Sequence, residues 1–319
     1  MDAGRAARRH QRRMIQAQKS TVSKLQEFPM KDKKKALRER FQQPGLLSAP
    51  GIHDMVSLRL ADTFGFDALY MTGFGTVASH MGLPDAGLAT YSDMVGRVKA
   101  MASMARTPLI ADGDTGYGGL LNVAHTVRGY EEAGAAAIQL EDQEFPKKCG
   151  HTPGRRVIPV ADMVRKIQVA SDARSSGDFL IIARTDARSA LGLDEALRRA
   201  ETYARAGADI LFVESPETQD EMRQIGSSFE LPLLANMVEG GRTPVLSQQE
   251  LEAIGYKLAI FPVTALLAAT QAMKAVYESF KKTGSSADIS TPLMPFADLT
   301  KLMGFEEIWE FEKRYANPD

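Results

Sequence analysis

The sequence contains a single cysteine, Cys149, in 319 residues, so no disulfide can form within the chain. This excludes a disulfide-stabilised secreted scaffold and predicts a reducing, cytoplasmic compartment. No apolar run reaches the roughly 18 residues that a transmembrane helix needs, and the amino-terminal region lacks the apolar core of a signal peptide. We therefore expect no membrane partner.

The chain also has little net charge, −1 at pH 7, which gives no general reason to expect a nucleic-acid partner. The charge is unevenly distributed, however. Up to Phe41 there are 13 Lys/Arg and 4 Asp/Glu, against 26 and 36 in the remainder. This basic segment could be an organelle-targeting arm or a nucleic-acid arm. We favour a disordered extension over residues 1–41, with the working protein beginning near Met30.

Beyond residue 41, short apolar runs alternate with amphipathic helical stretches such as Met163–Arg174 and Leu193–Ala206. The expected strands are Leu46–Ala49, Ala68–Thr72, Leu109–Asp112, Ala136–Glu141, Phe179–Thr185, Ile210–Glu214, Leu231–Asn236 and Leu258–Pro262. Strands separated by helices pair in parallel, and about eight such units favour a closed barrel. The sequence therefore predicts an α/β fold, a (β/α)8 TIM-type barrel over residues 42–285, followed by a helical segment over 286–319.

Polar side chains gather where these strands end. Asp112 and Asp114 alternate along one strand end, so their carboxylates can point the same way, and Glu141 ends the next strand. Because the carboxyl ends of barrel strands converge on one face, these acids predict a Mg²⁺ site, with Mn²⁺ as a possible substitute. Zinc is not expected, since no Cys and His cluster has the spacing of a zinc site.

The remaining chemistry lies in a basic, glycine-bearing stretch and at two further strand ends. Cys149 has Lys147, Lys148 and His151 as neighbours, which favours the thiolate and easy proton exchange. Arg184 ends an apolar strand, where a guanidinium can bind a carboxylate with two hydrogen bonds. The turn at residues 72–75 and the amide of Asn236 offer neutral donors for a second carboxylate or an oxyanion.

At these residues the chain resembles the isocitrate lyase and phosphoenolpyruvate mutase superfamily, from about Leu46 to Tyr277. The sequence Lys-Lys-Cys-Gly-His at 147–151 is typical of the lyase branch, which includes methylisocitrate lyase, 2,3-dimethylmalate lyase and oxaloacetate hydrolase. Similar strand-end motifs stand at 112–118, 141–143, 183–187 and 235–244. One position departs: methylisocitrate lyases usually have His two residues before the Glu of Glu141-Asp-Gln, and here it is Gln139.

The resemblance implies a role for each site residue. Asp112 would contact Mg²⁺ directly, and Asp85, Asp114 and Glu141 would hold its waters. The pocket would be lined by Tyr70, Thr72, Gly73 and Phe74, whose backbone donors stabilise an oxyanion. A small carboxylate substrate would be bound by Arg184, Glu214 and Asn236. Cys149 would be the general acid on a gating loop. The family also implies a homotetramer in which the last helix swaps between subunits, and the segment Phe296–Tyr315 suits such a contact.

Together these features predict a lyase that cleaves a 2-hydroxy di- or tricarboxylate. A base removes the hydroxyl proton, with Tyr70 as part of the relay, the C–C bond breaks to an α-keto acid and an enolate, and Cys149 protonates the enolate. Three alternatives stay open. One is a carboxyphosphonoenolpyruvate or phosphoenolpyruvate mutase, against which Lys-Cys-Gly-His argues. A second is an oxaloacetate hydrolase or decarboxylase. A third is a nucleic-acid-binding or non-catalytic protein.

Overall fold

Eight parallel strands form the centre of the part of the chain that the structure describes, residues 32–150, 152 and 154–316 of a computed structural model. The strands are β1 Leu47–Ile52, β2 Leu69–Met71, β3 Leu109–Asp112, β4 Ala137–Glu141, β5 Leu180–Thr185, β6 Ile210–Val213, β7 Leu234–Asn236 and β8 Leu258–Phe261. Their order is β6-β5-β4-β3-β2-β1-β8-β7, and a parallel bridge between Leu211 and Leu233 connects the two ends. The predicted barrel is therefore confirmed.

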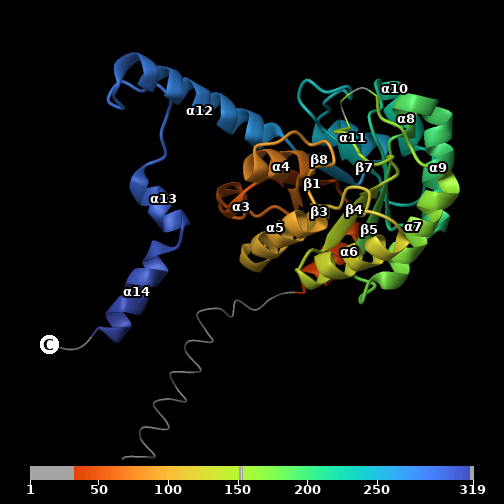
Figure 1. The fold of residues 1–319 in the computed structure, drawn as a ribbon, viewed down its shortest axis with the longest axis horizontal. Helices are drawn as coiled ribbons and strands as arrows, with labels where there is room; N and C mark the ends of the chain where they lie inside the picture. The colour runs from red at the N-terminus through yellow and green to blue at the C-terminus, as the bar shows by residue number, and fades with distance from the viewer. Residues whose placement is uncertain (1–31, 151, 153, 317–319) are drawn as a thin grey trace, which may run out of the picture.

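Helices between the strands surround this barrel, as Figure 1 shows. They are α3 Met55–Ala61, α4 Gly73–Met81, α5 Tyr91–Met104, α6 Leu120–Glu132, α7 Val160–Ala173, α8 Ala187–Leu191, α9 Leu193–Arg205, α10 Gln219–Gly226 and α11 Gln248–Ile254. The stretches predicted as helical at Met163–Arg174 and Leu193–Ala206 are α7 and α9. The strands are covered on the outside by helices and face the barrel interior on the inside, which explains why their sequences are apolar at consecutive positions.

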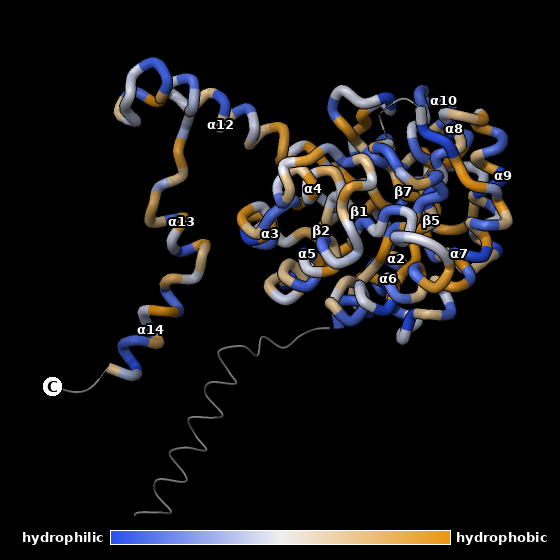
Figure 2. The backbone as a smooth tube through the Cα atoms, viewed as in Figure 1, coloured by the Kyte–Doolittle hydropathy of each residue, from blue (hydrophilic) through white to orange (hydrophobic). Residues whose placement is uncertain are grey.

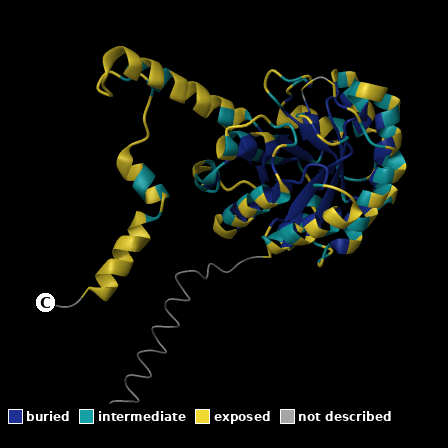
Figure 3. Cartoon of the chain, in the orientation of Figure 1, coloured by how far each residue is buried: buried dark blue, intermediate teal, exposed yellow. Residues whose placement is uncertain are grey.

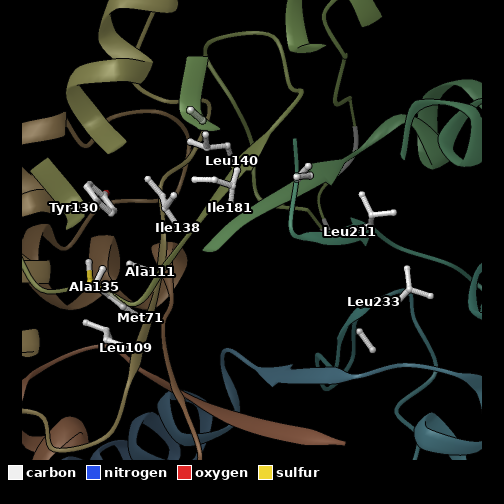
Figure 4. Packing of buried hydrophobic residues seen from close by; sticks show 14 of the residues in the cluster. Met71, Leu109, Ala111, Tyr130, Ala135, Ile138, Leu140, Ile181, Leu211 and Leu233 are labelled. Atoms are coloured by element: carbon white, nitrogen blue, oxygen red, sulfur yellow. The ribbon is translucent and has the colours of Figure 1, made fainter. Parts of the chain in front are cut away.

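The core has two layers because side chains alternate across each strand. Residues such as Leu47, Ile182 and Ile260 point into the barrel, whereas Met71, Ile138 and Ile181 pack between the strands and the helices (Figure 4). Both layers are buried (Figure 3). This packing makes the barrel a rigid support for groups at its strand ends.

Helix α2, Lys33–Gln42, lies within the segment that we expected to be a disordered extension. Asp32 caps it by accepting from the backbone of Lys34 and Lys35, and Leu37 is completely buried in the barrel-interior cluster. Charged residues of α2 bind residues that precede the strands, so the helix closes the amino-terminal end of the barrel. For residues 33–41 the expectation is therefore wrong. The rest of the predicted extension, 1–31, falls outside the described residues.

After β8, three helices extend away from the barrel, α12 Thr264–Thr283, α13 Phe296–Leu302 and α14 Phe305–Tyr315 (Figure 1). No residue of these helices is buried. They nevertheless carry several large apolar residues, and Figure 2 colours stretches of their backbone orange for high hydropathy. Arg59 of α3 holds this segment by donating to the carbonyl of Leu302, at 2.6 and 3.0 Å. Within the described ranges, no helix is long and apolar enough to cross a membrane.

Candidate active site

The carboxyl ends of the strands surround a pocket, where most of the predicted site residues meet. The predicted residues that line it are Tyr70, Thr72, Phe74, Asp85, Asp112, Glu141, Cys149, Arg184, Glu214 and Asn236. Gly73 and Asp114 lie directly behind this lining and contact Asp112 and Lys147 respectively. His151 falls outside the described residues.

Four carboxylates form the most charged part of the pocket. Asp112 ends β3, and its Oδ1 accepts from the backbone of Asp114 at 3.0 Å, which holds Asp114 in the left-handed region with φ 48°. The ammonium of Lys147 contacts Asp85 and lies 2.7 Å from Asp114 Oδ1. Burial raises the pKa of Asp114 to about 7, although Lys147 opposes the rise. The carboxylates are therefore crowded and need positive charge.

Glu141 gives a more specific indication that the pocket suits a cation. Burial raises the pKa of this carboxyl well above its usual range. Its Oε1 is buried and has no hydrogen-bond partner among the described residues, and Oε2 lies 3.4 Å from Arg184 Nη1. In the described part of the chain, no three acidic, His or Cys side chains converge closely enough to form a full metal cage. The arrangement fits Mg²⁺, which keeps several waters and takes one or two carboxylates directly.

Arg184 is the central cation of the pocket. Its Nε and Nη2 donate to the two oxygens of Asp186, each at 2.9 Å, and its guanidinium carbon lies 5.2 Å from the centre of the Phe212 ring. Glu214 lies 3.7 Å from Nη2, and Asn236 donates to both Glu214 oxygens at 3.3 Å. Burial acts to lower the pKa of Arg184, but these carboxylates raise it, so the group stays charged.

Tyr70 points into the barrel beside the carboxylates. Its hydroxyl donates to Gln139 Oε1 at 3.0 Å, while Gln139 Nε2 lies 3.5 Å from Asp112 Oδ1. Burial and the nearby Asp112 raise the pKa of Tyr70 well above its usual range. Tyr70 therefore keeps its proton near neutral pH and directs it to Gln139, which leaves a lone pair of the phenol oxygen for the pocket.

Helix α4 begins at the pocket and presents backbone donors to it. Thr72 is the N-cap and accepts from the backbone of Gly75. The N–H groups of Gly73 and Phe74 stand in the first turn, where an α-helix has no internal acceptors and attracts anions. A Cβ atom at Gly73 would lie 2.5 Å from Asp112 Oδ2. Only glycine lets the backbone approach this carboxylate so closely.

Cys149 stands on the loop between β4 and α7 and lines the pocket together with residues from other strand ends. Gln143 fixes the loop where it leaves β4, since its amide donates to Lys148 O at 2.8 Å and accepts from Lys148 N at 3.0 Å. A Cβ atom at Gly150 would lie 2.1 Å from Glu214 Oε1 and 2.4 Å from Arg184 Nη2. The thiol thus faces the same pocket as Arg184 and Asp112.

Several pocket residues were not assigned a site role from the sequence. The sequence indicates Lys147 only as a neighbour of the thiol, yet its ammonium forms ion pairs with both Asp85 and Asp114. One wall is apolar and comes from β8 and its surroundings: Val238, Ile260, Pro262, Val263 and Leu267. Aliphatic residues after a strand carry no signal that separates a pocket wall from ordinary core.

A barrel with acids, an arginine and a thiol around a pocket at its carboxyl end has the features of a barrel enzyme's active site. Residues 37–281 match the phosphoenolpyruvate phosphomutase family. The chain is 48% identical over 280 residues to 2,3-dimethylmalate lyase of Eubacterium barkeri, covering 88% of this chain and 97% of that protein. It is 41% identical to 2-methylisocitrate lyase of Aeropyrum pernix, covering 88% and 89%. The chain belongs to the phosphoenolpyruvate mutase and isocitrate lyase superfamily.

Solved structures agree with this placement. Oxaloacetate acetylhydrolase in complex with the inhibitor 3,3-difluorooxalacetate superposes with a TM-score of 0.85 at 33% identity, covering 92% of this chain and 99% of that one. Phosphonopyruvate hydrolase in complex with oxalate and Mg²⁺ gives a TM-score of 0.81 at 32% identity, covering 89% and 99%. The predicted family is confirmed.

Proposed function

We propose that the protein is a Mg²⁺-dependent carbon–carbon lyase that cleaves a 2-hydroxy dicarboxylate of the 2,3-dimethylmalate type. The observation that carries this proposal is the meeting of Cys149, Arg184 and Asp112 in one pocket. These groups supply a proton donor, a carboxylate receptor and a metal ligand, which a retro-aldol cleavage requires together. The similarity to curated lyases supports the same chemistry.

The carboxylate cluster is proposed to hold the metal. Asp112 would bind it directly, and Asp85, Asp114 and Glu141 would bind its waters, with Mn²⁺ as an acceptable substitute. A bound divalent ion would stabilise negative charge on the substrate oxygens during cleavage. The Oε1 of Glu141, which has no hydrogen-bond partner within the described part of the chain, supports the assignment, as does the Mg²⁺ in the complex of phosphonopyruvate hydrolase.

Substrate binding and proton transfer follow from the remaining groups. Arg184 Nη1 is the guanidinium nitrogen that is not engaged by Asp186, and it would bind a substrate carboxylate together with Asn236. The first-turn N–H groups of α4 would stabilise the oxyanion. A base takes the 2-hydroxyl proton, with Tyr70 as part of the relay, the C2 oxygen becomes the carbonyl of the α-keto acid, and the C2–C3 electron pair passes to the leaving fragment as an enolate. The Cys149 thiol then gives its proton to the enolate carbon.

The apolar wall supports a methyl-bearing dicarboxylate over a tricarboxylate. Val238, Ile260 and Leu267 offer no partner to a third carboxylate, whereas methyl groups gain about 0.8 kcal/mol for each carbon they bury. Gln139, which replaces the histidine usual in methylisocitrate lyases, agrees with this choice. Cleavage of 2,3-dimethylmalate between C2 and C3 would give pyruvate and propionate.

A substrate panel tests the proposal. The purified enzyme, with Mg²⁺ or with excess chelator, is given 2,3-dimethylmalate, 2-methylisocitrate, oxaloacetate or phosphoenolpyruvate, and products are separated by chromatography. Mg²⁺-dependent pyruvate and propionate from the first compound are expected. Oxalate and acetate from oxaloacetate, with no cleavage of the malates, would establish a hydrolase instead, and phosphonopyruvate from phosphoenolpyruvate would establish a mutase.

We also propose a cytoplasmic homotetramer in which the carboxyl-terminal helices contact a second subunit. One face of α14 exposes Phe305, Ile308 and Trp309, and these large apolar groups favour burial. Deleting residues 286–319 should reduce the mass measured by light scattering on a size-exclusion column. An unchanged tetramer would overturn this assembly.

A further inference from the structure

The loop that carries Cys149 also carries a buried arginine that the proposed chemistry does not use. Arg155 has only 1% of its side chain exposed. Its Nη1 donates to Asp186 Oδ1 at 2.5 Å and its Nη2 donates to Ser189 Oγ at 2.5 Å. A buried guanidinium is stable only when it is paired and hydrogen-bonded. These contacts therefore fix the loop to the groups that follow β5.

Asp186, which pairs with Arg155, also pairs with Arg184, the arginine proposed to bind the substrate. Asp186 Oδ1 accepts from Arg155 Nη1 and from Arg184 Nη2, while Asp186 Oδ2 accepts from Arg184 Nε. One carboxylate thus orients two guanidinium groups, one on the loop and one in the pocket. The hydrogen bonds to both oxygens of Asp186 therefore fix the orientation of Arg184 and tie it to the position of Arg155.

A second contact joins the same groups to the backbone beside the thiol. Ser215 Oγ donates to Gly150 O at 2.9 Å and lies 3.5 Å from Arg155 Nη2. Ser215 adopts φ 60°, a left-handed conformation that non-glycine residues rarely take. The Gly150 backbone also lies close to Arg184 and Glu214, since a Cβ atom there would lie 2.4 Å from Arg184 Nη2 and 2.1 Å from Glu214 Oε1.

We propose that Arg155 is a positioning residue that couples the seating of the Cys149 loop to the orientation of Arg184. This inference rests on the proposed function, since it assigns the loop and Arg184 to one lyase site. Arg155 touches neither the substrate nor the reacting atoms. It acts through Asp186, and a substrate carboxylate on Arg184 would in return stabilise the seated loop, because coupling between two sites is reciprocal.

The test combines kinetics with alkylation of Cys149, the single cysteine of the chain. In Arg155→Met, kcat should fall about tenfold to a hundredfold with a smaller change in KM, because the proton donor is misplaced. Without any ligand, iodoacetamide should modify Cys149 several times faster than in the parent enzyme. Oxalate with Mg²⁺ should protect the parent thiol and should protect the variant poorly.

Matched variants separate positioning from general stability. Arg155→Lys should recover part of the slow alkylation, because it keeps the charge. Arg174→Met removes a different arginine, which is partly buried and pairs with Asp209 away from the pocket, and should leave kcat and alkylation unchanged. If Arg155→Met fails to fold, Ser215→Ala removes the hydrogen bond to Gly150 O and the weaker contact with Arg155 Nη2, keeps the pairing of Arg155 with Asp186, and should also speed alkylation.

Unchanged alkylation and protection in Arg155→Met, or in Ser215→Ala where the first variant does not fold, would overturn the proposal. Loss of activity only in step with a lower melting temperature would do the same. The alkylation rate without ligand needs no substrate. If the parent enzyme cleaves nothing in the panel, the lyase proposal fails by itself, and the alkylation rates still decide whether Arg155 anchors the loop.

Discussion

The two ends of the barrel differ in how their buried charged groups are balanced. At the carboxyl end of the strands, buried acids with raised pKa values surround a pocket, and Glu141 keeps a buried oxygen without a partner among the described residues. At the amino end, helix α2 closes the barrel with Leu37 and with paired charges. Buried acids with raised pKa values thus lie at the carboxyl end, whereas the amino end is closed by apolar packing and ion pairs, as expected for a barrel that separates chemistry from stability.

The largest effect should come from the charged end. Asp112→Ala should lower turnover by about a thousandfold or more, because loss of a metal ligand removes several kcal/mol of charge stabilisation. The melting temperature should fall little or should rise, since one buried acid leaves a crowded cluster. Steady-state rates with Mg²⁺ in excess check this. Full turnover of the parent enzyme in excess chelator would refute the metal assignment.

At the closed end, Leu37→Ala should lower the free energy of unfolding by about 2–5 kcal/mol, since it leaves a cavity in the barrel interior. Urea unfolding monitored by circular dichroism measures this loss. The folded variant should keep the parent kcat and KM. A large loss of kcat without loss of stability would mean that α2 acts on the pocket and that the two ends are not separate.

A smaller effect concerns pH at the closed end. Burial opposes ionisation of Glu131, but hydrogen bonds from Lys34 and Ser175 outweigh it and hold the pKa below its ordinary value of 4.5. The lowered pKa means that Glu131 stabilises the fold above about pH 4.5 and that this contribution is lost as pH falls further. Glu131→Gln should melt below the parent at pH 7, and the gap should close in acid. A gap that is independent of pH would contradict this ion pair.

The smallest effect should come from the amino-terminal segment. Deleting Met1–Pro29 should leave turnover and assembly nearly unchanged, because the deletion spares α2. A longer deletion through Gln43 is the matched control and should destabilise the barrel, since it also removes Leu37. Loss of the oligomeric state in the shorter deletion would show that the segment is structural.

The strands could be predicted from the sequence because a barrel strand is buried on both faces and therefore reads as an apolar run. All eight expected strands overlap observed ones. The largest boundary differences are three residues each. Strand β1 was expected to end at Ala49 and ends at Ile52, and β7 was expected from Leu231 and begins at Leu234, after Pro232, which has no N–H for the ladder. The site acids and Arg184 could be predicted for a related reason. A charged residue at the end of a buried apolar strand is seldom needed for packing, so its position there indicates a functional site.

Helix α2 and the anchor of the loop could not be predicted in this way. Helix α2 is strongly basic and places only Leu37 and Phe41 toward the barrel, so its sequence resembles a solvated extension. Lys147 contacts Asp85 across 62 residues and Arg155 contacts Asp186 across 31. Such pairs depend on how the loops meet over the barrel, which local patterns do not determine.

The most direct test of the whole account is Cys149→Ala, measured by steady-state cleavage of 2,3-dimethylmalate and by a melting curve on the same preparation. Alanine fits the space of the thiol but cannot deliver a proton to the enolate. The account predicts that turnover falls by at least about a hundredfold and that the melting temperature stays within a few degrees of the parent value. Near-normal turnover, or a collapsed melting temperature, would contradict it.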